Sequence, residues 1–128
     1  MWYFDSSAIL EVMFKQKNSE LISALLGDSI FTSRLTRVEV LRQIAKRGPH
    51  LREGCEEFFI TCNLIEIERR FLKHAENYPP EITLKSSDAI HIATVECLQP
   101  LISGIVTLDK QMILNAKRLG IRVYEPAA

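Results

Sequence analysis

Four acidic residues occupy positions that set them apart from the other acids in the chain. Most of the sixteen acidic residues lie among polar neighbours and are typical of a solvated surface. Asp5 instead ends the apolar run MWYF, and Asp109 follows the largely apolar run GIVTL. Glu39 and Asp88 lie in the opening turns of expected helices. Carboxylate oxygens are hard ligands that suit Mg²⁺ or Mn²⁺, so together these residues could hold a divalent cation.

Each of these acids also has a purely structural explanation. Asp5 and Asp109 can cap the helices that follow them. Glu39 fits a capping box with Thr36, and it could also pair with a neighbour along its helix. Asp88 lies in a first helical turn, where the helix dipole favours an anion. Taken one at a time, the acids leave both explanations open.

The histidines and cysteines suggest no other metal site. His91 lies three residues after Asp88 on the same helical face, and we expect it to be packed or hydrogen-bonded rather than a ligand. The three histidines lie far apart, and the three cysteines show no C-x-x-C spacing. The cysteines are therefore expected to be free thiols in a reducing compartment. No Ser–His–Asp or Cys–His set suggests a covalent nucleophile.

Short apolar runs alternate with helical patterns along the whole chain, and these elements must position the acids. The predicted strands cover residues 2–5, 29–33, 63–67, 101–107 and 121–124. The predicted helices cover residues 6–15, 19–26, 35–47, 51–59, 68–77, 86–98 and 110–119.

Strands separated by helices imply parallel pairing with right-handed crossovers. The predicted fold class is α/β, a three-layer α/β/α sandwich with a mostly parallel sheet of about five strands. Ligand sites in such sheets form outside the carboxyl ends of the strands. All four acids can reach that edge, where their charges would repel each other unless a cation neutralised them.

Length and composition agree with one domain over residues 1–128. The formal net charge of zero argues against binding to nucleic acid mainly through a strong positive field. The N-terminus lacks the basic stretch of a signal peptide, and no apolar run has the length of a membrane span. We therefore expect a cytoplasmic protein that does not bind a membrane.

The ordered set of acids, with the residues around it, resembles the PIN-domain ribonucleases, and in particular the VapC-type toxins of toxin–antitoxin pairs. The resemblance extends from Tyr3 to Pro126. The stretches that carry it are YFDSSAIL, TSRLTRVEVLR, SSDAIHIATV and VTLDKQMILNAKRLGIRVYEP.

The resemblance implies a metal-dependent endoribonuclease that uses Mg²⁺ or Mn²⁺. Its catalytic and metal-binding residues would be Asp5, Glu39, Asp88 and Asp109. Thr107 of the T-x-D motif would orient the cluster, and Ser6 matches a small hydroxyl position that supports it. The resemblance also implies an RNA substrate, a cognate antitoxin protein as partner, and a homodimer. The RNA target, the number of metal ions and the dimer geometry do not follow from it.

Basic residues near the acids could guide an RNA strand. Arg34, Arg37 and Arg42 flank Glu39, and Lys110 follows Asp109. An ordinary solvated helix surface is the favoured explanation for them.

Two other functions fit parts of the sequence. A catalytically inactive PIN-like module that binds RNA or a protein is the alternative, although the complete set of acids argues against it. A receiver-like phosphoacceptor domain would need paired acids after the first strand and an Asp after the third. This chain has a single Asp5 after the first strand, and the third strand reads NLIEIE without an Asp.

Overall fold

Five parallel strands form the central sheet of the protein. The computed structural model describes residues 1–27 and 30–125. The strand order is β3-β2-β1-β4-β5, and every neighbouring pair is parallel. The strands are β1 (Trp2–Phe4), β2 (Phe31–Ser33), β3 (Asn63–Ile65), β4 (Gly104–Val106) and β5 (Val123–Tyr124).

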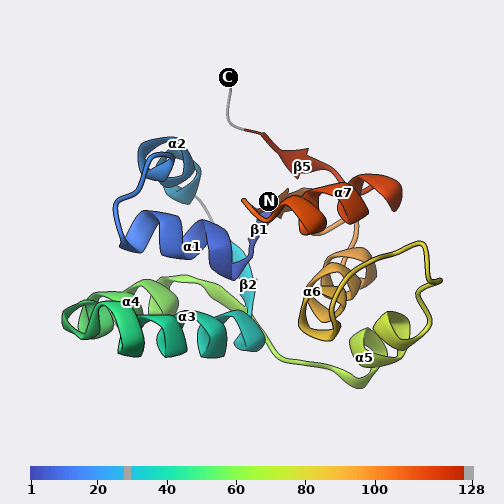
Figure 1. The fold of residues 1–128 in the computed structure, drawn as a ribbon, viewed down its shortest axis with the longest axis horizontal. Helices are drawn as coiled ribbons and strands as arrows, with labels where there is room; N and C mark the ends of the chain where they lie inside the picture. Colours follow the sequence, from blue (N-terminus) through green and yellow to red (C-terminus); the bar gives the residue numbers. More distant parts are fainter. Residues whose placement is uncertain (28–29, 126–128) are drawn as a thin grey trace.

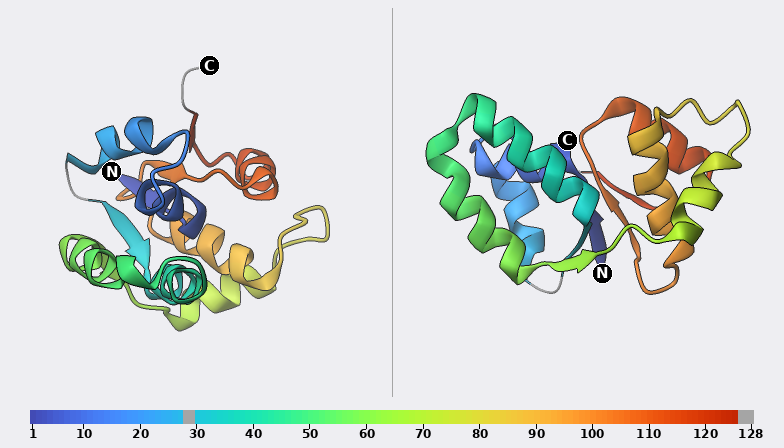
Figure 2. Two further views of the ribbon diagram at one scale, coloured as in Figure 1. Left: turned by 60° about the vertical axis from the view of Figure 1, so that its left-hand side comes forward. Right: turned by 90° about the horizontal axis from the view of Figure 1, so that it is seen from below.

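Helices cover both faces of this sheet (Figures 1 and 2). The helices α1 to α4 lie on one side, and α5 to α7 lie on the other. The predicted α/β/α sandwich is therefore confirmed. The helical elements are α1 (Ser6–Met13), α2 (Ser19–Ser23), η1 (Ala24–Gly27), α3 (Arg34–Arg47), η2 (Pro49–Leu51), α4 (Arg52–Thr61), α5 (Arg69–Glu76), α6 (Ser86–Cys97) and α7 (Lys110–Arg118).

Alternation along the central strands creates two hydrophobic cores. Phe4 and Val106 point into the core shared with α1 to α4, whereas Tyr3 and Ile105 point into the core shared with α6 and α7. Successive side chains of a strand point to opposite faces, so a strand buried on both sides favours apolar residues at every position. This is why β1 and β4 read as continuous apolar runs. Within residues 1–27 and 30–125, no helix is both long and apolar enough to cross a bilayer.

The order in which successive strands are added to the sheet reverses at β1. It runs from β1 outward to β2 and β3, and then crosses to β4 on the other side of β1. In open α/β sheets, a crevice forms beyond the carboxyl ends of the strands at such a switch point. Here the switch point lies between β1 and β4, so the residues that follow Phe4 and Val106 are placed beside the crevice.

Several elements are shorter than predicted. The fourth strand begins at Gly104 rather than at residue 101, since the Ile102 N–H still donates to the Leu98 carbonyl of the preceding helical segment. The helix expected over residues 19–26 is α-helical only to Ser23 and continues as the 3₁₀ turn η1. The predicted start of the second strand, Ser29, lies outside the described residues.

Candidate functional site

Asp5 is a buried carboxylate at the junction of β1 and α1. It caps α1, where Oδ1 accepts from the Ala8 N–H at 3.1 Å and from the Ser7 hydroxyl at 2.7 Å. Oδ2 accepts from the Thr107 hydroxyl at 2.5 Å, and the residue is only 3% exposed. The capping explanation for Asp5 is thus confirmed, and the carboxylate also lies at the carboxyl edge of the sheet.

The environment of Asp5 disfavours its charge. Burial raises the pKa of the Asp5 carboxyl, while the hydrogen bonds from Thr107, Ser7 and the Ala8 N–H act to lower it. Ionisation of the Asp5 carboxyl therefore carries a desolvation cost. A neighbouring cation would reduce that cost.

Thr107 links the ends of the two central strands. Its hydroxyl donates to Asp5, and its oxygen accepts from the Asp109 N–H at 3.1 Å. Asp109 in turn caps α7, because its Oδ1 accepts from the Met112 N–H at 2.9 Å. The sequence predicted both the cap and the local bonding of Thr107, and both predictions are confirmed. Asp109 itself is exposed.

The structure gives the supporting hydroxyl contact to Ser7 rather than to Ser6. The Ser7 hydroxyl donates to Asp5, lies 3.3 Å from the Thr107 hydroxyl and accepts from the Leu108 N–H at 2.9 Å. Both serines line a surface hollow near Glu39. Both serines lie in the first turn of α1, and one step along a helix turns a side chain by about 100°, which sequence order alone does not resolve.

Glu39 lies well inside α3 and is held by a histidine. The capping box predicted for Thr36 and Glu39 was wrong, because Ser33 caps α3 by accepting from the Leu35 N–H at 3.0 Å. The Glu39 Oε1 atom lies 2.6 Å from the His91 Nε2 atom, and the side chain is 28% exposed. The expectation that His91 is hydrogen-bonded is confirmed.

Asp88 lies in the first turn of α6, as predicted, and is half-buried. Burial raises the pKa of its carboxyl, and the negative charge of Asp109 is the next cause. Glu39 and Asp5 raise this pKa further, whereas His91 lowers it. The structure therefore brings the other three predicted acids into electrostatic reach of Asp88.

The four carboxylates do not surround a common point in the described structure. Among the residues that the structure describes, no three Asp, Glu, His or Cys side chains lie close enough to hold an ion between them. Three of the four acids are held in place by contacts within the protein. Asp5 is bound by Thr107 and Ser7, Glu39 by His91, and Asp109 by the first turn of α7.

The chemistry of this donor set fits a hard divalent cation. All four side chains offer carboxylate oxygens, the ligands that Mg²⁺ and Mn²⁺ prefer. Burial, and after it the negative charges of the other three acids, raises the pKa of Asp88, and a bound cation would offset both effects.

The predicted RNA-guiding residues lie in two different places. Arg34 and Arg37 lie toward β3 and α4, with ion-pair distances of 3.9 Å to Glu66 and to Glu56 respectively. Lys110 begins α7 directly after Asp109 and is exposed.

Arg42 shares a surface hollow with Glu39. This hollow, of about 380 Å³, is lined by Ser6, Ser7, Leu10, Val38, Glu39, Arg42 and Gln43. On α3, Arg42 is therefore the arginine beside the acids.

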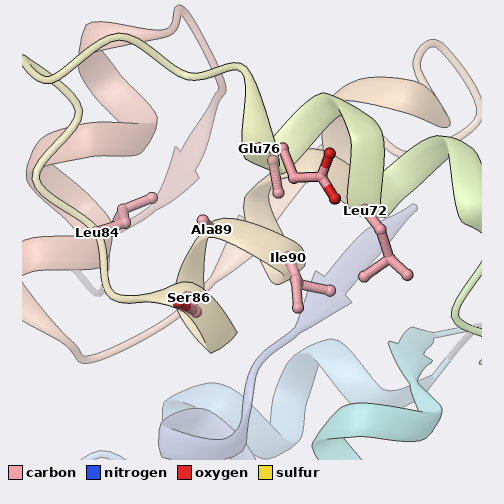
Figure 3. A pocket seen from close by; sticks show the side chains of 7 residues that line it. Leu72, Glu76, Leu84, Ser86, Ala89 and Ile90 are labelled. Carbon is pink, nitrogen blue, oxygen red and sulfur yellow. The ribbon is translucent and has the colours of Figure 1, made fainter.

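None of the four acids lines a second hollow. It has a volume of about 330 Å³ and is bordered by α5 and α6 (Figure 3). Its lining is mainly apolar, with Leu72, Leu84 and Ile90 facing it beside a single carboxylate, Glu76. The chemistry that the acids can perform therefore belongs to the sheet edge and not to this hollow.

Comparison with known proteins connects this arrangement to one family. The sequence profile of the PIN domain matches residues 2–117. The chain is 30% identical over 127 residues to Ribonuclease VapC46 of Mycobacterium tuberculosis, covering 98% of this chain and 97% of the relative. It is 26% identical over 135 residues to Ribonuclease VapC47 of the same species, covering 100% and 98%.

Solved structures share the fold. A toxin–antitoxin complex from Klebsiella pneumoniae superposes with a TM-score of 0.80 at 18% identity, covering 99% of this chain and 98% of that one. Mycobacterium tuberculosis VapC20, a toxin that cleaves the sarcin–ricin loop, superposes with a TM-score of 0.77 at 12% identity, covering 98% and 100%.

Proposed function

The chain belongs to the PIN-domain family, and on that premise we propose that it is an endoribonuclease that depends on Mg²⁺ or Mn²⁺ and acts as the toxin of a toxin–antitoxin pair. We propose one PIN domain over residues 1–128. The proposal is supported by the positions of Asp5 and Asp109 at the ends of β1 and β4, where both contact Thr107. It is also supported by Asp88, whose carboxyl lies close enough to feel the charges of the other three acids.

Asp5, Glu39, Asp88 and Asp109 are the residues that would hold the cation. When bound, a divalent cation lowers the pKa of its water from about 15.7 toward neutrality and offsets charge on a phosphate. Thr107 and Ser7 keep the Asp5 oxygens in place through their hydroxyls. Asp109 is fixed to the start of α7 by its cap, with its Oδ2 atom outside that contact.

Basic residues on either side of the acids are proposed to contact the RNA backbone. Arg42 borders the hollow beside Glu39, and Lys110 follows Asp109. Arg34 and Arg37 are weaker candidates, because both already lie near carboxylates of neighbouring elements. Charge reversal of Arg42 is expected to weaken RNA binding and to reduce its dependence on salt.

A cognate antitoxin is the proposed protein partner. The Klebsiella pneumoniae structure that shares this fold is a toxin–antitoxin complex, which supports a partner of that kind. Val38, which is 54% exposed, lines the hollow beside Glu39 and offers a partner an apolar contact next to the acids. A homodimer is proposed from the family resemblance alone, and sedimentation of the purified protein tests it.

The proposal is tested by RNA cleavage with a variant that should fold normally. Asp109→Asn keeps a good helix cap but removes the charge. Wild-type protein is expected to cleave structured RNA with Mg²⁺ or Mn²⁺, to stop in excess EDTA, and to recover when metal is restored. The cleavage activity of Asp109→Asn should fall by more than the roughly 10–100-fold that is expected when an outer partner of a metal site is removed.

Glu76→Gln is the matched control, because it removes one negative charge from a residue that is not among the four acids and that lines the apolar hollow between α5 and α6. It should cleave RNA as well as the wild type does. Equal cleavage by wild type and Asp109→Asn, or full activity in EDTA, would contradict the proposal. RNA that is bound with Mg²⁺ or Mn²⁺ but remains uncut would instead indicate an inactive binding module.

A further inference from the structure

Two successive hydrogen-bond contacts join β1, α6 and α3 and end at Glu39, one of the four acids. The Tyr3 hydroxyl lies 2.6 Å from the His91 Nδ1 atom, and the His91 Nε2 atom lies 2.6 Å from the Glu39 Oε1 atom. We propose that Tyr3 and His91 are positioning residues that hold the Glu39 carboxylate toward the metal site. This inference rests on the proposed function and adds to it how one ligand is held.

The three residues belong to three different elements, a strand and two helices. Glu39 comes from α3 on one face of the sheet, and His91 comes from α6 on the other. His91 follows Asp88 by three residues, so both lie on the same side of α6. A contact from His91 to Glu39 therefore fixes a carboxylate of α3 relative to a carboxylate of α6.

The ring of His91 has little freedom. The residue is 1% exposed, and Tyr3 is fully buried beside it with the two rings edge to face at 5.9 Å. A carboxylate only accepts hydrogen bonds, so Nε2 carries the hydrogen of the Glu39 contact. In the neutral ring Nδ1 is then the acceptor, and the Tyr3 hydroxyl can donate to it. Tyr3 thereby fixes both the orientation and the tautomer of the ring.

The Tyr3 hydroxyl is suited to donate because it stays protonated. Burial raises the pKa of the Tyr3 phenol, and the negative charges of Asp5 and Glu39 raise it further. The Ser33 and Thr36 hydroxyls act in the opposite direction, although the Thr36 oxygen does not meet the geometry of a hydrogen bond in the described structure.

Two substitutions separate positioning from packing. In His91→Gln, the amide nitrogen can replace Nε2 and donate to Glu39, but the contact with Tyr3 is lost. In His91→Asn, the shorter side chain can replace Nδ1 near Tyr3, but it does not reach Glu39. Both variants create a similar cavity in the core, so a purely structural role predicts similar behaviour.

The experiment measures Mn²⁺ binding to RNA-free protein by calorimetry, together with urea unfolding of each variant. His91→Asn is expected to weaken Mn²⁺ binding roughly 10–100-fold. His91→Gln should remain much closer to the wild type, although both variants lose comparable stability. Equal Mn²⁺ affinity in both variants would overturn the inference.

Glu39→Gln separates this inference from the proposed function. If wild type binds Mn²⁺ and Glu39→Gln binds it no more weakly, the role of Glu39 as a ligand fails, and the inference fails with it. If Glu39→Gln weakens binding while both His91 variants bind like the wild type, only the inference fails.

Tyr3→Phe provides a test that leaves the His91 side chain itself unchanged. The variant keeps the aromatic packing of the core and removes only the hydroxyl. Nitrogen-15 spectra should show the His91 hydrogen on Nε2 in the wild type and a mixture of tautomers in Tyr3→Phe, with weaker Mn²⁺ binding. A Tyr3→Phe protein with wild-type spectra and wild-type Mn²⁺ affinity would exclude a positioning role for Tyr3.

Discussion

Replacement of Asp5 by Asn is expected to stabilise the protein in EDTA and to remove its stabilisation by Mn²⁺. Burial raises the pKa of the Asp5 carboxyl despite three opposing hydrogen bonds. An acid whose folded pKa lies above its unfolded value of about 3.9 binds its proton more tightly in the folded state. Its ionisation therefore destabilises the fold at neutral pH, by about 1.4 kcal/mol for each pKa unit of difference.

The substitution should leave no buried polar group unpaired. The Asn Oδ1 atom can accept from the Ser7 hydroxyl and the Ala8 N–H, as the Asp5 Oδ1 atom does. The Asn amide group then faces the Thr107 oxygen, which has two lone pairs and uses one for the Asp109 N–H. The Thr107 hydroxyl no longer donates to residue 5, but its hydrogen can turn to the Ser7 oxygen 3.3 Å away. The charge is lost and no polar group is left unpaired, so the gain in stability should not be offset.

The assay compares urea unfolding of wild type and Asp5→Asn in EDTA between about pH 4 and pH 7.5. The variant should be the more stable protein at neutral pH. The difference should narrow as the pH falls, because Asp5 of the wild type then takes up a proton. Saturating Mn²⁺ should reverse the order, since a ligand at 100 times its Kd stabilises the protein that binds it by about 2.7 kcal/mol.

Asp109→Asn is the control for this prediction. It changes an exposed helix cap into another good cap, so its stability in EDTA should differ little from that of the wild type. If Asp5→Asn were less stable than wild type at neutral pH by an amount independent of pH, the argument from burial would be refuted.

Two further predictions concern residues that support the site and the sheet. Thr107→Val should lower the free energy of unfolding by about 1.5–3 kcal/mol, because a hydrogen bond to the Asp5 carboxylate is lost, and it should weaken Mn²⁺ binding in calorimetry. Thr94→Val is its control, since that hydroxyl only bonds back to a carbonyl of its own helix, and Mn²⁺ binding should not change. Gly104→Ala should destabilise the protein by about 3 kcal/mol in urea unfolding, because its Cβ would lie 2.3 Å from a main-chain oxygen of the adjacent segment. Gly54→Ala, in a helix with open space around it, should instead stabilise by about 0.5–1 kcal/mol, and the reverse order of the two glycine variants would contradict the packing argument.

Local patterns in the sequence were sufficient for the order of elements and the fold class. Buried parallel strands favour apolar residues at every position, whereas helices repeat with a period of 3.6 residues, and both patterns can be read within a few residues. The same patterns did not determine the residues at which each element begins and ends. The fourth strand begins at Gly104 because the segment before it continues the hydrogen bonding of α6.

Caps and supporting hydroxyls were the least predictable local features. The segment that contains Ser33, Thr36 and Glu39 offers two capping patterns, and only the end of β2 decides that Ser33 caps the helix. Ser6 and Ser7 have the same chemistry, and the rotation of α1 against β4 decides that Ser7 meets Thr107.

The sequence by itself determined which acids the protein has at the ends of its strands and the starts of its helices. Only the tertiary structure decided what each carboxylate contacts. Tyr3 and His91 are 88 positions apart, and in the sequence one is an apolar strand residue and the other a lone histidine. Tyr3 meets His91, and His91 meets Glu39, because α3 and α6 lie on opposite faces of the sheet and come within hydrogen-bond distance at its edge. The electrostatic cost of burying Asp5 likewise depends on the whole fold, since desolvation comes from every atom that excludes water from it.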